Sequence, residues 1–186
     1  MLPLAHAAIG LLAYAGVQLP RDWRSLTVGG AAAALLGSQF PDLIDKPLAY
    51  MGLIPSGRSV AYSLFVLGVV GLFLYVYTPS EWRLEALAFL TAALSHPLVD
   101  AHQQLLEQGV SGLPGYLLWP ITQAPRYGDP AAPWLRVVRI YSSPDLGLQT
   151  LGLLAIVGVV FAGRAAVELY QISEVTMRAA LGMVRN

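Results

Sequence analysis

The stretch "SVAYSLFVLGVVGLFLYVYT", residues 59–78, decides the fold class, because it runs for 20 residues without a charged side chain. A helix of this length measures about 30 Å, which matches the hydrocarbon core of a lipid bilayer. The whole chain agrees: 56% of its 186 residues are hydrophobic and 12% are charged, whereas roughly a quarter are charged in a soluble domain. The sequence therefore predicts an all-α membrane protein.

Further apolar segments flank this stretch, and we expect them to cross the membrane as well: residues 3–20, 27–40, 84–99 and 146–163. The segment 27–40 is short and rich in glycine and alanine, which favours a helix packed closely against its neighbours. The segment 146–163 carries no charge and is predicted to be a transmembrane helix. We expect residues 1–186 to form a single integral membrane domain, a helical bundle of about five transmembrane segments.

The remaining long segments are expected to lie at the membrane surface. Residues 104–143 are a long connection with many aromatic residues, which predicts an ordered interfacial loop in which Tyr116, Trp119 and Trp134 lie at the boundary between lipid and water. The chain after Arg164 predicts an amphipathic C-terminal helix. The N-terminal segment lacks the basic start of a secretory signal, so we interpret it as retained.

Charge and cysteine content exclude several classes of function. The basic and acidic residues, 11 of each, cancel, so no net field attracts nucleic acid and we expect no nucleic-acid partner. The chain has no cysteine, which removes disulfides, thiolate metal sites and cysteine nucleophiles. Any metal must therefore be bound by imidazole and carboxylate groups.

The ionisable residues at the predicted helix ends gather on one side of the membrane. With five crossings, alternate segment ends face the same side, and the side of the N-terminus receives His6, Asp42, Asp45, Arg58, His96, Asp100 and His102. Ionisable groups at the membrane edge are costly to desolvate, which makes them functional candidates. The predicted metal ligands among them are His6, Asp42, Asp45, His96 and Asp100.

The sharpest motif is "SHPLVD", residues 95–100. His96 and Asp100 are four residues apart, so both side chains leave one face of a helix within reach of a common ion. Each motif alone also has a structural interpretation: a helix-end ion pair for His96 and Asp100, and a helix end followed by a turn for "PDLID", residues 41–45. Together, the convergence of a histidine and several acids favours a divalent cation, with zinc the best match.

The motifs occur along the chain in the order "LAHAAIG", "FPDLID", "SGRSVAYS", "SHPLVD" and "LLWPI". This order resembles the membrane-bound metal-dependent hydrolases of the inner-membrane YdjM type, described as LexA-regulated hydrolases. The resemblance implies an integral protein of a prokaryotic inner membrane. That family is similar in its ligand pattern to zinc-dependent phospholipase C and nuclease proteins, which implies phosphoester hydrolysis at a cluster of histidine and aspartate.

The sequence departs from the family pattern just before the helix expected at 59–78. The family has the form His-Arg-Gly-x-Thr-His-Ser, whereas this chain has "GRSVAYS", residues 57–63. Gly57 and Tyr62 thus stand where the two histidines would be. Tyrosine binds a metal only as a phenolate, and its ordinary pKa is about 10. The departure therefore favours a site with fewer metal ions, or with none.

The resemblance and the residue chemistry together suggest a mechanism. A cation held by the predicted ligands would lower the pKa of water and turn it into a nucleophile. The predicted catalytic residues are Asp45, Arg58 and His102. A spare carboxylate would orient the water or act as a base, and the Arg58 guanidinium would pair with phosphate oxygens. Arg58 equally suits a structural role as an interfacial anchor.

Several classes of function stay open on this sequence. The first is a hydrolase acting on a membrane lipid or another small amphiphilic phosphoester. The second is a catalytically degenerate membrane scaffold or interaction protein, which Gly57 and Tyr62 favour. A transporter is the third and weakest, because the chain has no duplicated halves. Basic residues in the short breaks and the tail lie opposite the candidate site, so we expect that site on the extracytoplasmic side of the inner membrane.

Overall fold

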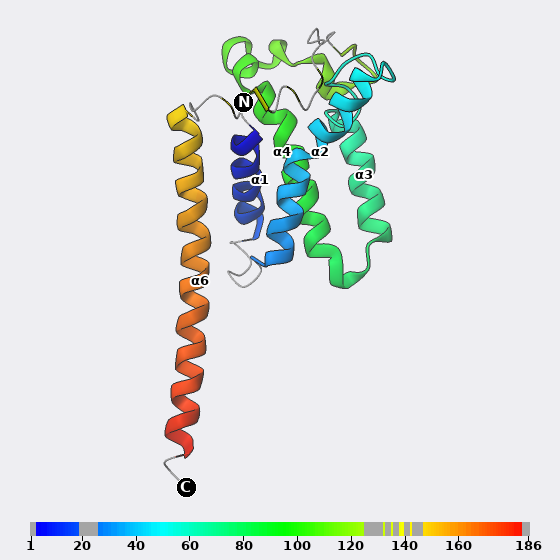
Figure 1. Ribbon diagram of the computed structural model, residues 1–186. Helices are drawn as coiled ribbons and strands as arrows, with labels where there is room; N and C mark the ends of the chain where they lie inside the picture. Colours follow the sequence, from blue (N-terminus) through cyan, green and yellow to red (C-terminus); the bar gives the residue numbers. More distant parts are fainter. Residues whose placement is uncertain are drawn as a thin grey trace.

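The computed structural model describes residues 3–18, 26–124 and 147–183, with the single positions 132, 135, 138, 139 and 142. Every regular element within these residues is helical, which confirms the all-α prediction. The elements are α1 (Pro3–Gln18), α2 (Val28–Tyr50), α3 (Leu64–Tyr77), η2 (Ser80–Trp82), α4 (Arg83–Gln108), η3 (Gly109–Gly112), η4 (Gly115–Leu118) and α6 (Gly147–Met183) (Figure 1).

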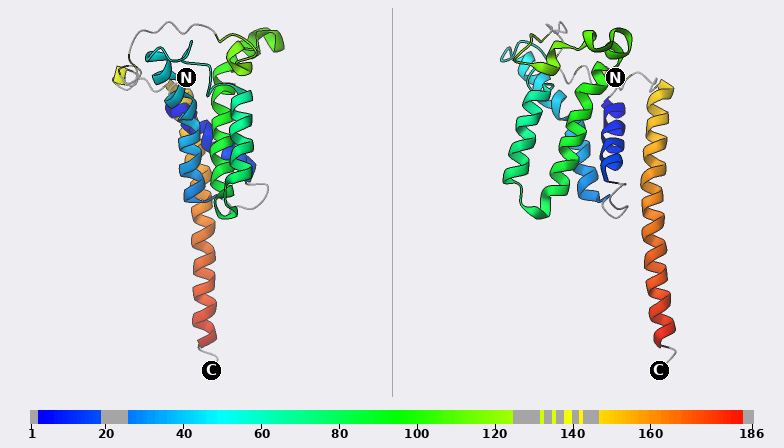
Figure 2. Two further views of the ribbon diagram at one scale, coloured as in Figure 1. Left: turned by 90° about the vertical axis from the view of Figure 1, so that its right-hand side faces the viewer. Right: turned by 180° about the vertical axis from the view of Figure 1, so that it is seen from behind.

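Helices α1, α2 and α4 pack together as the centre of the bundle, with α3 against α4 and α6 against α1 (Figures 1 and 2). Small residues allow the central helices to approach closely. A Cβ on Gly37 would lie 2.1 Å from the Phe89 carbonyl oxygen, and one on Gly10 would lie 2.6 Å from Cβ of Ser38. Only glycine fits where backbones come this near. The prediction that residues 27–40 form a helix packed closely against its neighbours is confirmed.

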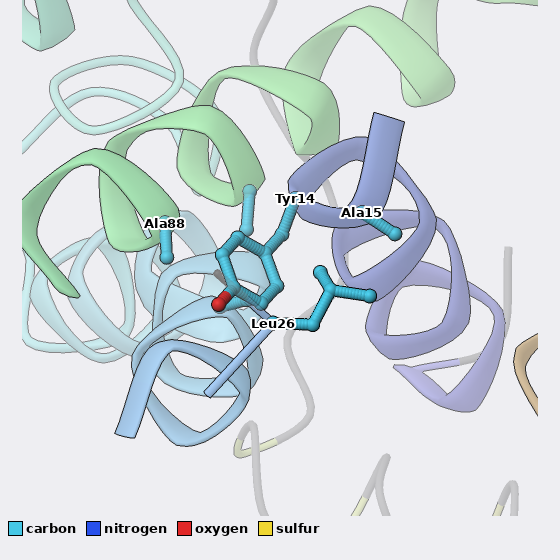
Figure 3. Close-up of a cluster of buried hydrophobic side chains, with 6 residues drawn as sticks. Tyr14, Ala15, Leu26 and Ala88 are labelled. Carbon is cyan, nitrogen blue, oxygen red and sulfur yellow. The ribbon is translucent and has the colours of Figure 1, made fainter. Parts of the chain in front are cut away.

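A cluster of buried apolar side chains packs among α1, α2 and α4 (Figure 3). Its buried members are Tyr14, Ala15, Leu26, Ala34, Ala88 and Ala92. The Tyr14 hydroxyl accepts a hydrogen bond from the Thr27 backbone N–H at 3.0 Å, and the Thr27 side chain caps α2 by accepting from the Gly30 N–H at 2.9 Å. The core therefore also fixes where α2 begins, because its one large aromatic side chain holds the capping residue.

Helix lengths differ from those expected for five uniform crossings. In the described residues, two helical stretches are long and apolar enough to span a membrane, Ser80–His102 and Thr150–Glu174. The 14 residues of α3 measure about 21 Å and the 37 residues of α6 about 55 Å. Helix α6 accordingly extends well beyond the bundle (Figure 2). Five transmembrane segments therefore stay a prediction.

Helix α2 continues far beyond the predicted segment. The expectation that "PDLID" forms a turn is wrong, because the helix runs on to Tyr50 through Pro41 and Pro47. A proline has a backbone φ compatible with a helix and removes one hydrogen bond there. The helix ends only before Gly52, whose φ of 72° is the left-handed conformation that glycine adopts most readily. Asp42 and Asp45 therefore project from a helix.

Two other predicted boundaries are also wrong. The helix expected over 59–78 begins at Leu64, because the preceding residues form a turn and Ser63 caps the helix by accepting from the Val66 N–H at 3.3 Å. The separate amphipathic helix expected after Arg164 does not occur in the described part of the chain. Helix α6 runs without a break from Gly147 to Met183. A pair between Arg164 and Glu168 at 2.6 Å lies on one face of that helix.

The predicted interfacial loop is partly described. Its first residues belong to α4, which reaches Gln108 and ends at Gly109 with a φ of 60°. Tyr116 is 2% exposed, so its side chain faces the protein interior, and its place at the membrane interface stays a prediction. Trp119 is half-buried, and its carbonyl oxygen accepts from the Ser63 hydroxyl at 2.5 Å. Trp134 lies outside the described residues.

Candidate functional site

A cluster of polar side chains lies at the end of the bundle where the start of α1, the second half of α2, the start of α3 and the second half of α4 meet, the upper end in Figure 1. At its centre, the Tyr62 hydroxyl lies 2.6 Å from Asp42 Oδ1, 2.9 Å from His96 Nε2 and 3.2 Å from Asp100 Oδ2. A phenol carries one proton. Several acceptor atoms therefore surround a single donor.

The protonation of His96 follows from its other ring nitrogen. His96 Nδ1 contacts the backbone carbonyl oxygen of Ser38 in α2. A carbonyl oxygen only accepts, so this nitrogen carries a proton, and in a neutral ring Nε2 is then an acceptor. It faces the Tyr62 hydroxyl and lies 3.6 Å from Asp42 Oδ1. The Tyr62 hydroxyl thus faces more acceptor atoms than its one proton can serve.

His6 completes the cluster from α1. Its Nε2 lies 3.0 Å from Asp100 Oδ1, and its ring stacks on that of His96 with centroids 3.9 Å apart and planes 20° apart. The ligand atoms of His6, His96 and Asp100 all lie within 4.8 Å of one another. Both histidines are buried, at 4% and 1% exposed. Two imidazoles and a carboxylate thus converge in the part of the protein that is shielded from solvent.

Two cations balance the acids of the cluster. Arg58 Nη2 lies 2.9 Å from Asp100 Oδ2, and Lys46 Nζ lies 2.5 Å from Asp42 Oδ2. The Arg58 side chain is 30% exposed, so the guanidinium forms the outer edge of the cluster. Its central carbon lies 5.8 Å from the centroid of the Tyr62 ring, within the range of a cation–π contact.

Asp45 stands apart from this cluster and organises the turn before α3. Its Oδ2 accepts from the backbone N–H groups of Ser59 at 2.6 Å and Tyr62 at 3.4 Å, and its Oδ1 accepts from Ala61 at 2.9 Å. The carboxyl group is fully buried. These bonds fix the backbone of Tyr62 and so place its hydroxyl. The structure gives Asp45 a positioning role, and its predicted metal-binding and catalytic roles stay predictions.

Burial and the surrounding charges keep the Tyr62 hydroxyl neutral. Burial, together with the carboxylates of Asp42 and Asp100, raises the pKa of Tyr62 far above its ordinary value. Burial also raises the pKa of Tyr116 to about 12. Both phenols are therefore hydrogen-bond donors at neutral pH, and Tyr62 would become a phenolate only beside a strong compensating charge.

His102 does not join the cluster. It follows Asp100 by two residues, which turns its side chain about 200° around α4. The ring is exposed, and its Nδ1 lies 2.5 Å from the Val99 carbonyl oxygen. The structure therefore brings together His6, Asp42, Arg58, His96 and Asp100 of the predicted site, and leaves His102 on the outer surface of the helix.

The family of the chain follows from comparison with known proteins. A family model described as YdjM inner membrane protein matches residues 1–181, nearly the whole chain. The chain belongs to the YdjM inner membrane protein family. Comparisons with curated proteins and with solved structures find no match. Membership of the YdjM family, together with the two long apolar helices, places the protein in the inner membrane.

The departure from the YdjM family pattern falls at the centre of the cluster. Tyr62, which the resemblance sets at a histidine position of that pattern, presents its hydroxyl to Asp42, His96 and Asp100. The predicted metal ligands did not include Tyr62, and a ligand role at this position stays untested. Gly57, at the other histidine position, is buried beside Arg58.

Sequence reasoning did not single out other residues that complete the site in this YdjM family member. Lys46 directly follows the "PDLID" motif, and its spacing of four from Asp42 is the signal that could have found it. Tyr116 packs edge-on against Tyr62 with ring centroids 5.5 Å apart. Its distance along the chain from Tyr62 left no local signal of this contact.

Proposed function

We propose that this protein is a membrane-embedded metal-dependent hydrolase that cleaves a phosphoester in a lipid-like substrate. The observation that carries the proposal is the convergence of His6, His96 and Asp100, whose ligand atoms lie within 4.8 Å of one another, beside Asp42. Titratable groups that gather in a buried place are candidates for a functional site. Membership of a family of inner-membrane proteins supports a substrate that is itself a membrane component.

The donor set fits a divalent cation. Imidazole nitrogens and carboxylate oxygens are the ligands that zinc takes in proteins without thiolates. The lone pairs that surround the single Tyr62 proton are a further argument, because a cation would satisfy more of them at once. His6, His96 and Asp100 would hold the ion, and Asp42 would lie beside it. When bound, zinc supplies Lewis acidity and makes water a nucleophile at neutral pH.

The residues of the chain have separate tasks in this proposal. The Ser38 carbonyl oxygen orients the His96 ring and fixes which nitrogen faces the cluster. Asp42 lies where a carboxylate can accept the proton of the attacking water, and the contact with Lys46 keeps it ionised. Arg58 at the outer edge of the cluster would hold an anionic phosphate group with its planar guanidinium.

A specific observation favours a second candidate function. The Tyr62 hydroxyl already links Asp42, His96 and Asp100 in one hydrogen-bond network. A network of this kind holds helices α2 and α4 together without an ion. A catalytically degenerate membrane scaffold of the same family would keep such a network for stability alone.

Metal analysis of purified variants separates the two functions. We expect the wild type to retain close to one zinc ion per chain and His96→Ala to lose it, together with turnover of a short-chain phosphoester lipid. His102→Ala is the matched control for metal content, because this histidine lies on the exposed surface of the same helix. Equal metal content in the three proteins would favour the scaffold.

A further inference from the structure

The Tyr116 hydroxyl is a buried donor that the hydrogen bonds of the described residues leave unused. Tyr116 is 2% exposed, and its oxygen has no hydrogen-bond partner within the described part of the chain. Buried hydroxyl groups are almost always hydrogen-bonded, because an unmade bond costs the full desolvation of the group. An unused donor beside a candidate catalytic cluster therefore points to a ligand that supplies the acceptor.

Tyr116 borders the cluster on the side of Arg58. Its ring packs edge-on against Tyr62, and the Arg58 central carbon lies 5.8 Å from the centroids of both rings. The same guanidinium is paired with Asp100 at 2.9 Å. The Arg58 guanidinium thus lies near the Tyr116 ring and is paired with Asp100, a residue that would hold the metal, and both Arg58 and Tyr116 carry donor groups.

The segment that carries Tyr116 is held firmly against the bundle. The Ser63 hydroxyl, at the start of α3, donates to the Trp119 carbonyl oxygen at 2.5 Å. The Thr122 hydroxyl donates to the Gly115 carbonyl oxygen at 2.5 Å, and a Cβ on Gly115 would lie 2.3 Å from the Gln123 carbonyl oxygen. The position of Tyr116 is therefore set in advance, as a binding residue requires.

We infer that Tyr116 and Arg58 form a subsite for a phosphate group, with the Tyr116 hydroxyl donating to one oxygen and the Arg58 guanidinium to others. This inference rests on the proposed function and deepens it by adding Tyr116 as a second donor to the phosphate group that Arg58 would hold. A phosphate group offers several charged acceptor oxygens in a tetrahedral arrangement, so it can engage both donors and still face the metal ligands. A lipid headgroup and free phosphate share this chemistry.

Tyr116→Phe tests the subsite, because it removes the hydroxyl and keeps the ring. Binding of inorganic phosphate and of dihexanoyl phosphatidic acid is measured by calorimetry on the full-length protein in a phosphate-free detergent. We expect Tyr116→Phe to weaken binding by about tenfold or more, the loss typical of a hydrogen bond to a charged group. Tyr75→Phe is the matched control, since Tyr75 is 73% exposed on α3. The melting temperature of Tyr116→Phe should not fall.

Each outcome of this experiment supports or overturns the phosphate subsite. Weaker binding of both probes by Tyr116→Phe supports a subsite that recognises the phosphate group itself. Weaker binding of one probe alone supports the subsite and identifies whether a lipid headgroup or free phosphate occupies it. Unchanged affinity in Tyr116→Phe, no binding of either probe to the wild type, or a lower melting temperature in Tyr116→Phe would overturn it. Turnover of the lipid probe is measured separately. If phosphate binding depends on Tyr116 but no turnover is found, the hydrolase proposal is wrong and the subsite is supported. If turnover is found but Tyr116→Phe binds phosphate as tightly as the wild type, only the subsite is wrong.

Discussion

Replacing Asp45 by asparagine should destabilise the protein far more than the same change at Asp42. Both acids belong to the "PDLID" motif, yet their surroundings differ. The Asp45 carboxylate is fully buried and accepts from the backbone N–H groups of Ser59, Ala61 and Tyr62. The Asp42 side chain is 19% exposed, and its partner Lys46 is 26% exposed.

The magnitude follows from the number of acceptor atoms. Asparagine has one carbonyl oxygen and an amide that only donates, so Asp45→Asn must set a donor against the N–H of Ala61 or against that of Ser59. Losing a charged hydrogen bond and burying an unsatisfied N–H should lower the free energy of unfolding by about 2–4 kcal/mol. Asp42→Asn keeps an acceptor for Tyr62 and loses a partly exposed ion pair, for which we expect about 1 kcal/mol or less.

Unfolding in detergent and hydrogen exchange together measure this difference. The two variants are unfolded by denaturant under identical conditions, and amide exchange is followed over residues 56–63. Asp45→Asn should accelerate exchange at Ser59 and Ala61, because their N–H groups are the ones released. The reasoning is refuted if Asp42→Asn is as destabilising as Asp45→Asn, or if the amides of the turn stay protected in Asp45→Asn.

Two further predictions concern the metal and the orientation of the chain. Tyr62→His should increase the zinc content of the purified protein, because imidazole is a better neutral ligand at a position that already faces Asp42 and His96; unchanged zinc in that variant would contradict a ligand position at 62. In this cysteine-free chain, a single cysteine at Leu53, 67% exposed, should react with a membrane-impermeant reagent added outside the cell, while one at Trp82, 60% exposed, should not. Reaction at position 82 alone would place the candidate site in the cytoplasm.

Part of the candidate site could be predicted because its members lie close in sequence. His96 and Asp100 share a helix face at a spacing of four, and the structure keeps them on one face toward the cluster. Helix boundaries were predicted less well. Proline inside "PDLIDKP" suggested a turn, yet α2 continues to Tyr50 because tertiary packing on α4 outweighs a local break.

The sequence alone was sufficient for the helical membrane class, for the close packing of residues 27–40 and for most of the candidate ligands, because hydrophobicity, small-residue content and helical spacing are local properties. Tertiary structure decided which of those residues meet. His6 and Asp100 are 94 positions apart, and no spacing rule reaches across that distance. Likewise, only the folded chain shows Asp45 holding a backbone turn and His102 exposed on the outer surface of α4. Contacts between helices depend on how side chains pack in the folded protein, and local sequence patterns do not specify that packing.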